Sequence, residues 1–370
     1  MIFMVQTNFL QSLWVQSLSI INGLARLHLN NNSVPSIMLS ISEFKRRFKP
    51  ARENKPAVLP QALHQFLTDV HPKVMDIGAR SGPLHEMEML APYAHFVICE
   101  PDVTEAERVK QQLMRQWRDI TVITQALARA NGTVALHITA QPGLSSIVTP
   151  NQAVYAQYQH FAEHPEYKID HTITVPALTL ETAAQQYHLQ DVALMKLDTQ
   201  GSELEILQSG SQSALDEVVA IYIEGELKPF YTDQPLMADV MQFLDRHGFT
   251  ALEMKRSALR RYTINQVAFS KREIGWVHCL YFRQKRNDGS ALTLTQQLRL
   301  VCIALTYQYF DYAMWLLEQP AVAAHNLKQY GTTLQPELVT YTQDVWNGLS
   351  AADQANAKGL VTTDRVYDLL

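Results

Sequence analysis

The chain has few cysteines, and their number and spacing exclude two classes of small stabilised domain. Its 370 residues include only Cys99, Cys279 and Cys302, which lie far apart in the sequence. An odd and scattered set excludes a disulfide framework and a cysteine-based zinc cluster, and it favours a reducing compartment. We therefore expect a cytoplasmic protein.

Long apolar runs and an excess of positive charge are also absent. No segment reaches the ~20 apolar residues that a membrane-spanning helix needs, and no Lys or Arg precedes Arg26 to form the basic start of a secretory signal. Lys and Arg number 31 against 36 Asp and Glu, which gives a formal charge of −5. Because binding to phosphates normally requires a basic surface, we expect no nucleic-acid partner.

What the chain has in abundance is an alternation of apolar strand patterns and helical patterns. The strand patterns lie at 73–77, 95–100, 120–124, 192–198, 218–224 and 276–283. Further extended segments are expected at 133–139 and 173–178, and a helix is expected at 104–117. Such alternation predicts an α/β fold with a doubly wound, mostly parallel sheet. In sheets of this kind ligands bind at the carboxyl ends of the strands.

Changes in composition divide the chain into three parts. Residues 1–70 form a helical extension that ends in a proline-marked linker, and residues 71–286 hold the α/β domain. Residues 287–370 form a second helical extension, in which 292–317 carries aromatic weight in one or two amphipathic helices. An aromatic helical face of this kind makes a homo-oligomer a candidate assembly.

The first strand ends in an acid and a glycine-bearing turn. Asp76 is followed by Gly78 and Gly82, which allow a close approach of the backbone to a ligand. The N–H groups of such a turn favour polar or anionic ligand groups. The spacing Asp-x-Gly-x-x-x-Gly is neither a dinucleotide fingerprint nor a Walker loop.

Two more acids close apolar strands, Glu100 and Asp198. All three should therefore meet at one rim of the sheet, where carboxylates are costly unless they are paired or liganded. An acid at the position of Glu100 typically accepts hydrogen bonds from both hydroxyls of a ribose. Lys196, inside a buried strand, is expected to pair with a nearby acid, and His278 is interpreted as a structural or surface histidine.

Several segments resemble known methyltransferase motifs. Residues 76–82 (DIGARSG) and 99–102 (CEPD) are similar to the first two cofactor motifs of class I S-adenosylmethionine-dependent methyltransferases. Residues 194–207 (LMKLDTQGSELEIL) resemble the more specific signature of the FkbM family, Leu-Lys-Ile-Asp-x-x-Gly-x-Glu-x-x-x-Leu. Segments 143–146 (GLSS) and 224–231 (EGELKPFY) agree with that family.

The resemblance implies a Rossmann-like sheet of seven strands and an enzyme that uses S-adenosyl-L-methionine. It further implies O-methylation of a hydroxyl on a sugar, glycan or secondary metabolite, with a place in polysaccharide biosynthesis. The cofactor contacts that we expect are Asp76, Gly78, Ala79, Arg80, Gly82, Glu100, Pro101, Gln125, Ala126, Ser145, Ser146 and Asp198.

The chain departs from the family at one cofactor segment. Members usually have Ala-Leu-Gly-Asp before a hairpin, whereas this chain has Ala126, Leu127, Ala128 and Arg129. The glycine and the acid are missing, so we expect a backbone group or the side chain of Gln125 to contact the adenine instead.

For catalysis, a sugar hydroxyl is a poor nucleophile that benefits from a base or a metal ion. Asp198 is the best-placed candidate for either role. Glu203 and Glu224 are candidates to bind the acceptor or a divalent cation, although Glu203 could equally stabilise a helix N-terminus. Tyr231 and Gln234 are expected to line the acceptor site. The sequence leaves open a nucleotide-binding oxidoreductase and a non-catalytic binding module as alternative functions.

Overall fold

A computed structural model describes residues 59–349, apart from 141, 165–166, 212, 265–266, 268–269 and 332–333, together with residue 354. These residues all belong to one compact unit, Ala57–Leu370. Of the N-terminal extension predicted for residues 1–70, residues 1–58 lie outside the described residues. Its last part forms helix α3 (Gln61–Val70).

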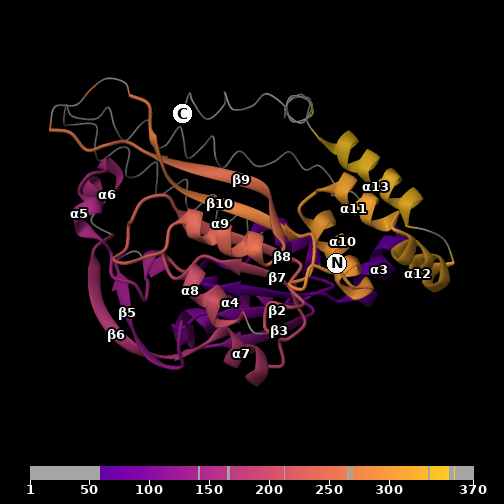
Figure 1. Ribbon diagram of the computed structural model, residues 1–370, viewed down its shortest axis with the longest axis horizontal. Coiled ribbons are helices and arrows are strands. Elements are labelled where there is room, and N and C mark those ends of the chain that lie inside the picture. The colour runs from indigo at the N-terminus through magenta and orange to yellow at the C-terminus, as the bar shows by residue number, and fades with distance from the viewer. Residues whose placement is uncertain are drawn as a thin grey trace, which may run out of the picture. The chain divides into compact units, whose positions relative to one another are not determined.

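A seven-stranded sheet forms the centre of the fold, as predicted (Figure 1). Its strands, in the order β3-β2-β1-β7-β8-β10-β9, are β1 (Lys73–Ile77), β2 (His95–Cys99), β3 (Asp119–Ile123), β7 (Val192–Leu197), β8 (Ala220–Glu226), β9 (Phe249–Leu259) and β10 (Glu273–Arg283). Strands β3, β2, β1, β7 and β8 are parallel, and β10 runs antiparallel to both of its neighbours. The strand order reverses between β1 and β7, which is where this class of sheet binds ligands.

Helices cover both faces of the sheet because successive strand residues point to opposite sides. Val74 of β1 lies in the cluster that includes α3, α4 (Val103–Leu113) and α10 (Leu294–Thr306). Its neighbour Met75 lies in the cluster that includes α7 (Leu180–Gln186), α8 (Glu203–Ser209) and α9 (Met237–Arg246). No helix of the described residues has both the length and the apolar character needed to cross a bilayer.

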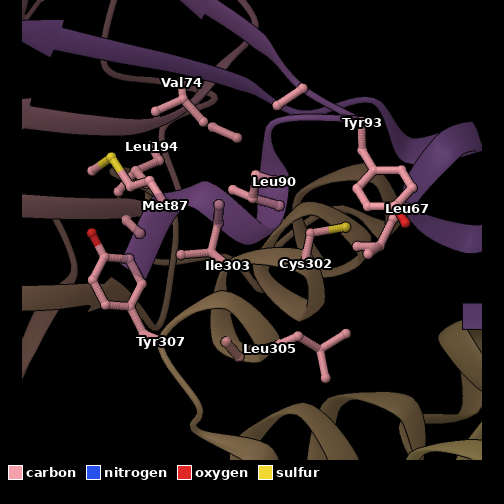
Figure 2. Close-up of a cluster of buried hydrophobic side chains, with 14 of the residues drawn as sticks. Leu67, Val74, Met87, Leu90, Tyr93, Leu194, Cys302, Ile303, Leu305 and Tyr307 are labelled. Carbon is pink, nitrogen blue, oxygen red and sulfur yellow. The ribbon is translucent and has the colours of Figure 1, made fainter. Parts of the chain in front are cut away.

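The C-terminal segment completes one face of the sheet. The aromatic segment at 292–317 forms two helices, α10 and α11 (Phe310–Leu317), and α12 (Pro320–Tyr330) and α13 (Gln335–Gly348) follow. Figure 2 shows Cys302 and Ile303 of α10 beside Leu90 of the 3₁₀ helix η2 (His85–Leu90), with Val74 and Leu194 of the central strands nearby. Because these side chains are buried together, α10 is part of the core.

A small second sheet lies outside the main one. It has the order β4-β6-β5 and contains β4 (Ala126–Leu127), β5 (Gly132–Thr139) and β6 (Ile169–Leu178). The two predicted extended segments at 133–139 and 173–178 are its long strands. The chain between them forms the 3₁₀ helix η3 (Pro142–Leu144) and the short helices α5 (Gln152–Tyr155) and α6 (Gln159–Glu163).

The sequence patterns did not predict strand β9, and they predicted one helix that is longer than the observed one. Strand β9 is an edge strand with exposed charged residues such as Lys255 and Arg256, so it has no buried apolar run to reveal it. The helix expected at 104–117 is α4, which ends at Leu113. Trp117, expected in that helix, instead packs against Phe96 of β2 with ring centroids 4.3 Å apart.

The acid that pairs with Lys196, as expected for a lysine in a buried strand, is Asp76. The Nζ of Lys196 donates to Oδ1 of Asp76 over 2.8 Å, and both side chains are buried between the neighbouring strands β7 and β1. Burial raises the pKa of Asp76 to about 6, so its carboxylate is ionised at neutral pH. Burial alone would lower the pKa of Lys196, but the charges of Asp76 and Asp198 raise it above its ordinary value.

We predict that Lys196→Ala destabilises the fold by about 3–5 kcal/mol, because it leaves the buried Asp76 carboxylate without a counter-charge. Lys73→Ala is the matched control, since Lys73 pairs with the half-exposed Asp191 and should cost at most about 1 kcal/mol. Urea unfolding followed by circular dichroism measures both changes. Equal losses in the two variants would contradict a special role for the buried pair.

Candidate functional site

The ends of three neighbouring strands are held side by side at the point where the strand order reverses. The N–H of Gly78, after β1, donates to the carbonyl of Cys99 over 3.1 Å, and the N–H of Asp198, after β7, donates to the carbonyl of Ile77 over 3.1 Å. Glu100, after β2, is bonded in the same way to the last residue of β3. The parallel pairing thus continues one residue beyond the strands, and Gly78, Glu100 and Asp198 share one rim.

Gly78 lets the turn after β1 lie directly against Asp198. Its φ is +83°, and a Cβ at this position would stand 2.0 Å from the carbonyl oxygen of Asp198. Only glycine satisfies both constraints, because other residues are strained at this φ and carry the clashing atom. The glycine here makes room for the protein's own backbone, which fixes where Asp198 lies.

A cleft with an empty volume of about 630 Å³ opens at this rim. Of the twelve expected cofactor residues, those that line it are Gly78, Arg80, Glu100, Pro101, Gln125, Ala126, Ser145, Ser146 and Asp198. Asp76, Ala79 and Gly82 lie outside its lining. Asp76 instead pairs with Lys196, although its other oxygen, Oδ2, is buried without a hydrogen-bond partner in the described part of the chain.

Glu100 is the buried acid of the cleft and is held by two neighbours. Its Oε1 accepts the backbone N–H of Asp102 over 2.9 Å, and its Oε2 lies 3.7 Å from Nε of Arg80. Burial raises the pKa of Glu100, against the opposing effects of that hydrogen bond and of Arg80. Arg80 also donates to Asp102 over 2.7 Å, and this second contact fixes the guanidinium beside the cleft.

Part of the cleft lining is apolar. Ala126, Leu136 and Ile147 pack in one cluster, and Leu127 also lines the cleft. Gln125 lines the cleft as well, and its Oε1 accepts a hydrogen bond from the hydroxyl of Tyr187 over 3.0 Å. An apolar slot with one amide fits a flat heteroaromatic ring.

The loop after β7 is tied down by Glu203 and Ser146. The carboxylate of Glu203 accepts the backbone N–H of Thr199 over 2.6 Å and that of Gly201 over 3.1 Å. The hydroxyl of Ser146 donates to the carbonyl of Gln200 over 2.7 Å. Glu203 was predicted to act on the acceptor, but it lies outside the lining of the cleft and of the second cavity described next.

Gln200 joins the cleft to a second cavity, with an empty volume of about 400 Å³. Its Nε2 donates to Oδ1 of Asp198 and to Oε2 of Glu224, each over 2.8 Å, while its Oε1 accepts the hydroxyl of Tyr231 over 2.8 Å. The second cavity, called the aromatic pocket below, is lined by Leu144, Tyr155, Phe161, Tyr167, Gln200, Glu224, Glu226, Phe230, Tyr231 and Trp276.

The carboxyl groups between the two cavities differ in protonation. Burial would raise the pKa of Asp198, but Lys196 and hydrogen bonds from Glu224 and Gln200 hold it below its ordinary value. Burial, followed by the charge of Asp198, raises the pKa of Glu224 well above its ordinary value. Burial and the neighbouring Glu203 raise the pKa of Glu226 to about 8. The charged form is therefore favoured for Asp198, whereas the protonated form is favoured for Glu224 and Glu226.

Tyr231 and Gln234, both predicted at the acceptor site, occupy different positions. The Tyr231 ring lines the aromatic pocket and packs on Gly201, where an added Cβ would lie 2.8 Å from the ring. Gln234 lies behind that wall, where it accepts the backbone N–H of Tyr231 over 2.6 Å and donates to Glu226 over 3.0 Å.

Sequence reasoning missed several residues of the site. Gln200 and Trp276 line it, and His278 lies 3.6 Å from Glu224. Gln200 belongs to the motif at 194–207. Nothing in the sequence, however, predicted its left-handed backbone conformation (φ 61°) or the hydrogen bonds by which its side chain links Asp198, Glu224 and Tyr231. Tyr155 and its neighbours on α5 and α6 come from the insertion between β5 and β6, whose position beside β8 is decided by tertiary contacts. Within the described residues no group of three or more His, Cys, Asp or Glu side chains is arranged to hold a metal ion.

We predict that Gly78→Ala is more destabilising than Gly82→Ala, although both glycines have positive φ. The backbone strain of each change should cost about 1–2 kcal/mol. Only the Gly78 variant adds a clash, with the Asp198 carbonyl, which should cost a further ~1–3 kcal/mol. Urea unfolding of the two variants measures the difference, and equal losses would contradict the close approach.

Comparison with known proteins places the chain in a family. Residues 76–251 match the Methyltransferase FkbM domain, and no curated protein matches the chain. Similar solved structures include a precorrin-6y C5,15-methyltransferase from Geobacter metallireducens (11% identity, 62% of this chain and 91% of that chain, TM-score 0.29). TrmK from M. capricolum, bound to S-adenosyl-homocysteine, is 9% identical over 77% of this chain and 98% of its own, with a TM-score of 0.28.

The N-methyltransferase NodS from Bradyrhizobium japonicum is 9% identical over 60% of this chain and 92% of its own, with a TM-score of 0.27. Because these superpositions are loose, the assignment rests on the sequence match and on the signature after β7. Residues 76–251 therefore form a domain of the FkbM methyltransferase family.

Proposed function

We propose that this methyltransferase transfers a methyl group from S-adenosyl-L-methionine to a hydroxyl oxygen of a sugar, glycan or related metabolite. One observation carries the proposal: the ionised Asp198 lines the cleft, and its partner Gln200 also lines the aromatic pocket. The carboxylate is therefore placed at the junction between a candidate donor site and a candidate acceptor site.

The cleft has the chemistry that the methyl donor requires. The buried carboxyl of Glu100 is an acceptor for ribose hydroxyls, and the apolar part of the lining suits the adenine ring. The amide of Gln125 offers hydrogen bonds in place of the acid that this chain lacks after Ala128. When bound, the sulfonium of S-adenosylmethionine supplies an electrophilic methyl group.

The aromatic pocket has the chemistry that a sugar requires. Rings such as Tyr231 and Trp276 offer flat apolar faces, and the carboxyl groups of Glu224 and Glu226 offer hydrogen-bond donors and acceptors to hydroxyls. Because both carboxyls are largely protonated at neutral pH, the pocket carries less negative charge than its composition implies. A neutral, hydroxyl-bearing ring is the ligand that fits this mixture best.

We assign proton transfer to Asp198, with Glu224 in a supporting role. Asp198, held ionised by Lys196, accepts the proton of the acceptor hydroxyl as the oxygen becomes bonded to carbon. Glu224, which keeps its own proton, donates a hydrogen bond to Asp198 and so fixes the carboxylate toward the junction. Gln200 orients both groups through its two donated hydrogen bonds.

We expect wild-type protein to bind S-adenosylhomocysteine, and Glu100→Ala to bind it at least tenfold more weakly. Loss of a hydrogen bond to a charged group should cost roughly 1.5–3 kcal/mol. Calorimetric titration measures both affinities, with Glu107→Gln, an exposed acid on α4, as the control. Failure of the wild type to bind would overturn the donor assignment and reopen the alternative functions named above.

We expect Asp198→Asn to lower kcat by about 10²–10⁴, the usual contribution of a general base. Glu224→Gln keeps a neutral donor at the same position and should retain activity within about tenfold. Methyl transfer from tritiated S-adenosylmethionine to a panel of sugars, glycosides and amines measures both. Methylation confined to the amines would contradict the hydroxyl assignment.

The same assay should reveal the proton on Glu224. Because the protonated form supports Asp198, the wild-type rate should fall as pH rises through the raised pKa of Glu224. Glu224→Gln, which has no proton to lose at this position, should lack that alkaline decline. Identical pH profiles in the two proteins would show that Glu224 does not control the reaction.

A further inference from the structure

We propose that the acceptor carries an anionic group, a phosphate or a carboxylate, which binds in a hollow beside the aromatic pocket. This hollow, called the outer subsite below, has an empty volume of about 820 Å³ and lies between α6 and the strands β9 and β10. It includes Arg260, Arg272, His160 and Trp276 in its lining. The inference rests on the proposed function, because it extends the acceptor site assigned above.

The outer subsite and the aromatic pocket share one wall. Trp276 of β10 lines both cavities. Its ring meets Phe230 of the aromatic pocket in an edge contact, with centroids 6.3 Å apart. An acceptor larger than one sugar ring would therefore reach the outer subsite from the aromatic pocket.

Two arginines of the outer subsite lack counter-charges. In the described part of the chain, Arg260 and Arg272 form no ion pair, and the buried Nε of Arg260 has no hydrogen-bond partner. Arg261, next in sequence, is by contrast paired with Glu273 over 2.6 Å. The carboxylate of Glu163 also lines the hollow, and it accepts the side-chain amide of Gln159 over 2.8 Å.

The two arginines flank the end of the β9–β10 pair. The last pair of this antiparallel ladder is Leu259 with Glu273, and Arg260 follows β9 while Arg272 precedes β10. Both line the outer subsite. An oxyanion bound there would offset their positive charge, and arginine is well suited to phosphate and carboxylate.

The two cavities also differ in charge. The charged form of Asp198 is favoured where the cleft meets the aromatic pocket, whereas the outer subsite holds two arginines and one acid, Glu163. An anionic group would be repelled by Asp198 and attracted by Arg260 and Arg272 in the outer subsite. The arrangement therefore orients an acceptor with its neutral hydroxyl-bearing ring inside and its anionic group outside.

The test compares three probes that differ only in the anion: glucose, glucose 6-phosphate and glucuronate. We measure their binding to the full chain, saturated with S-adenosylhomocysteine, by saturation-transfer NMR titration. We expect at least one of the two anionic probes to bind at least tenfold more tightly than glucose. Preference for glucose 6-phosphate identifies a phosphate site, and preference for glucuronate identifies a carboxylate site.

The variant Arg260→Gln/Arg272→Gln should remove that preference, whereas Arg115→Gln, an exposed arginine before β3, should retain it. Equal or absent binding of all three probes to wild type, or an unchanged preference in the double variant, would overturn the outer subsite. Titration of S-adenosylhomocysteine into the same proteins before any cofactor is added separates the two proposals. A protein that binds it without an anion preference loses only this inference, whereas one that does not bind it loses the proposed function.

Discussion

The buried ion pair between Lys196 and Asp76 is the interaction on which both the fold and the site depend. It joins β1 to β7 at the point where the strand order reverses, and the next residues of these strands carry Gly78 and Asp198. The same ammonium group is the main attraction that keeps Asp198 ionised despite its burial. One cation therefore serves two purposes: it compensates a buried acid in the core, and it favours the charged form of the carboxyl group at the rim.

Protonation explains how so many acids can share the rim. Asp198, Glu203, Glu224 and Glu226 influence one another electrostatically, and like charges at short range cannot all ionise. Lys196 favours the charged form of Asp198, while burial and the charge of Asp198 favour the protonated form of Glu224. Chemically similar side chains thus differ in pKa because their surroundings differ.

The site is assembled from segments with different structural purposes. The strand ends after β1, β2 and β7 form the cleft, and their positions follow from the pairing of the central sheet. The aromatic pocket instead draws its walls from the insertion that carries α5 and α6, packed against β8 and β10. A rigid core holding the donor site, with an inserted segment shaping the acceptor site, is how one fold accommodates different acceptors.

The sequence by itself predicted six of the seven strands of the main sheet, the acids at the strand ends and the resemblance to the FkbM family, because apolar periodicity and local motifs are written in consecutive residues. It also predicted the partner class of Lys196 and most of the cleft. Only the tertiary structure decided that Asp76 faces Lys196, that Glu203 holds a loop, and that Gln200 joins two cavities. The sequence also did not predict edge strand β9 or the aromatic residues of α5 and α6 that line the aromatic pocket. These features depend on contacts between residues distant in sequence, which no local pattern encodes.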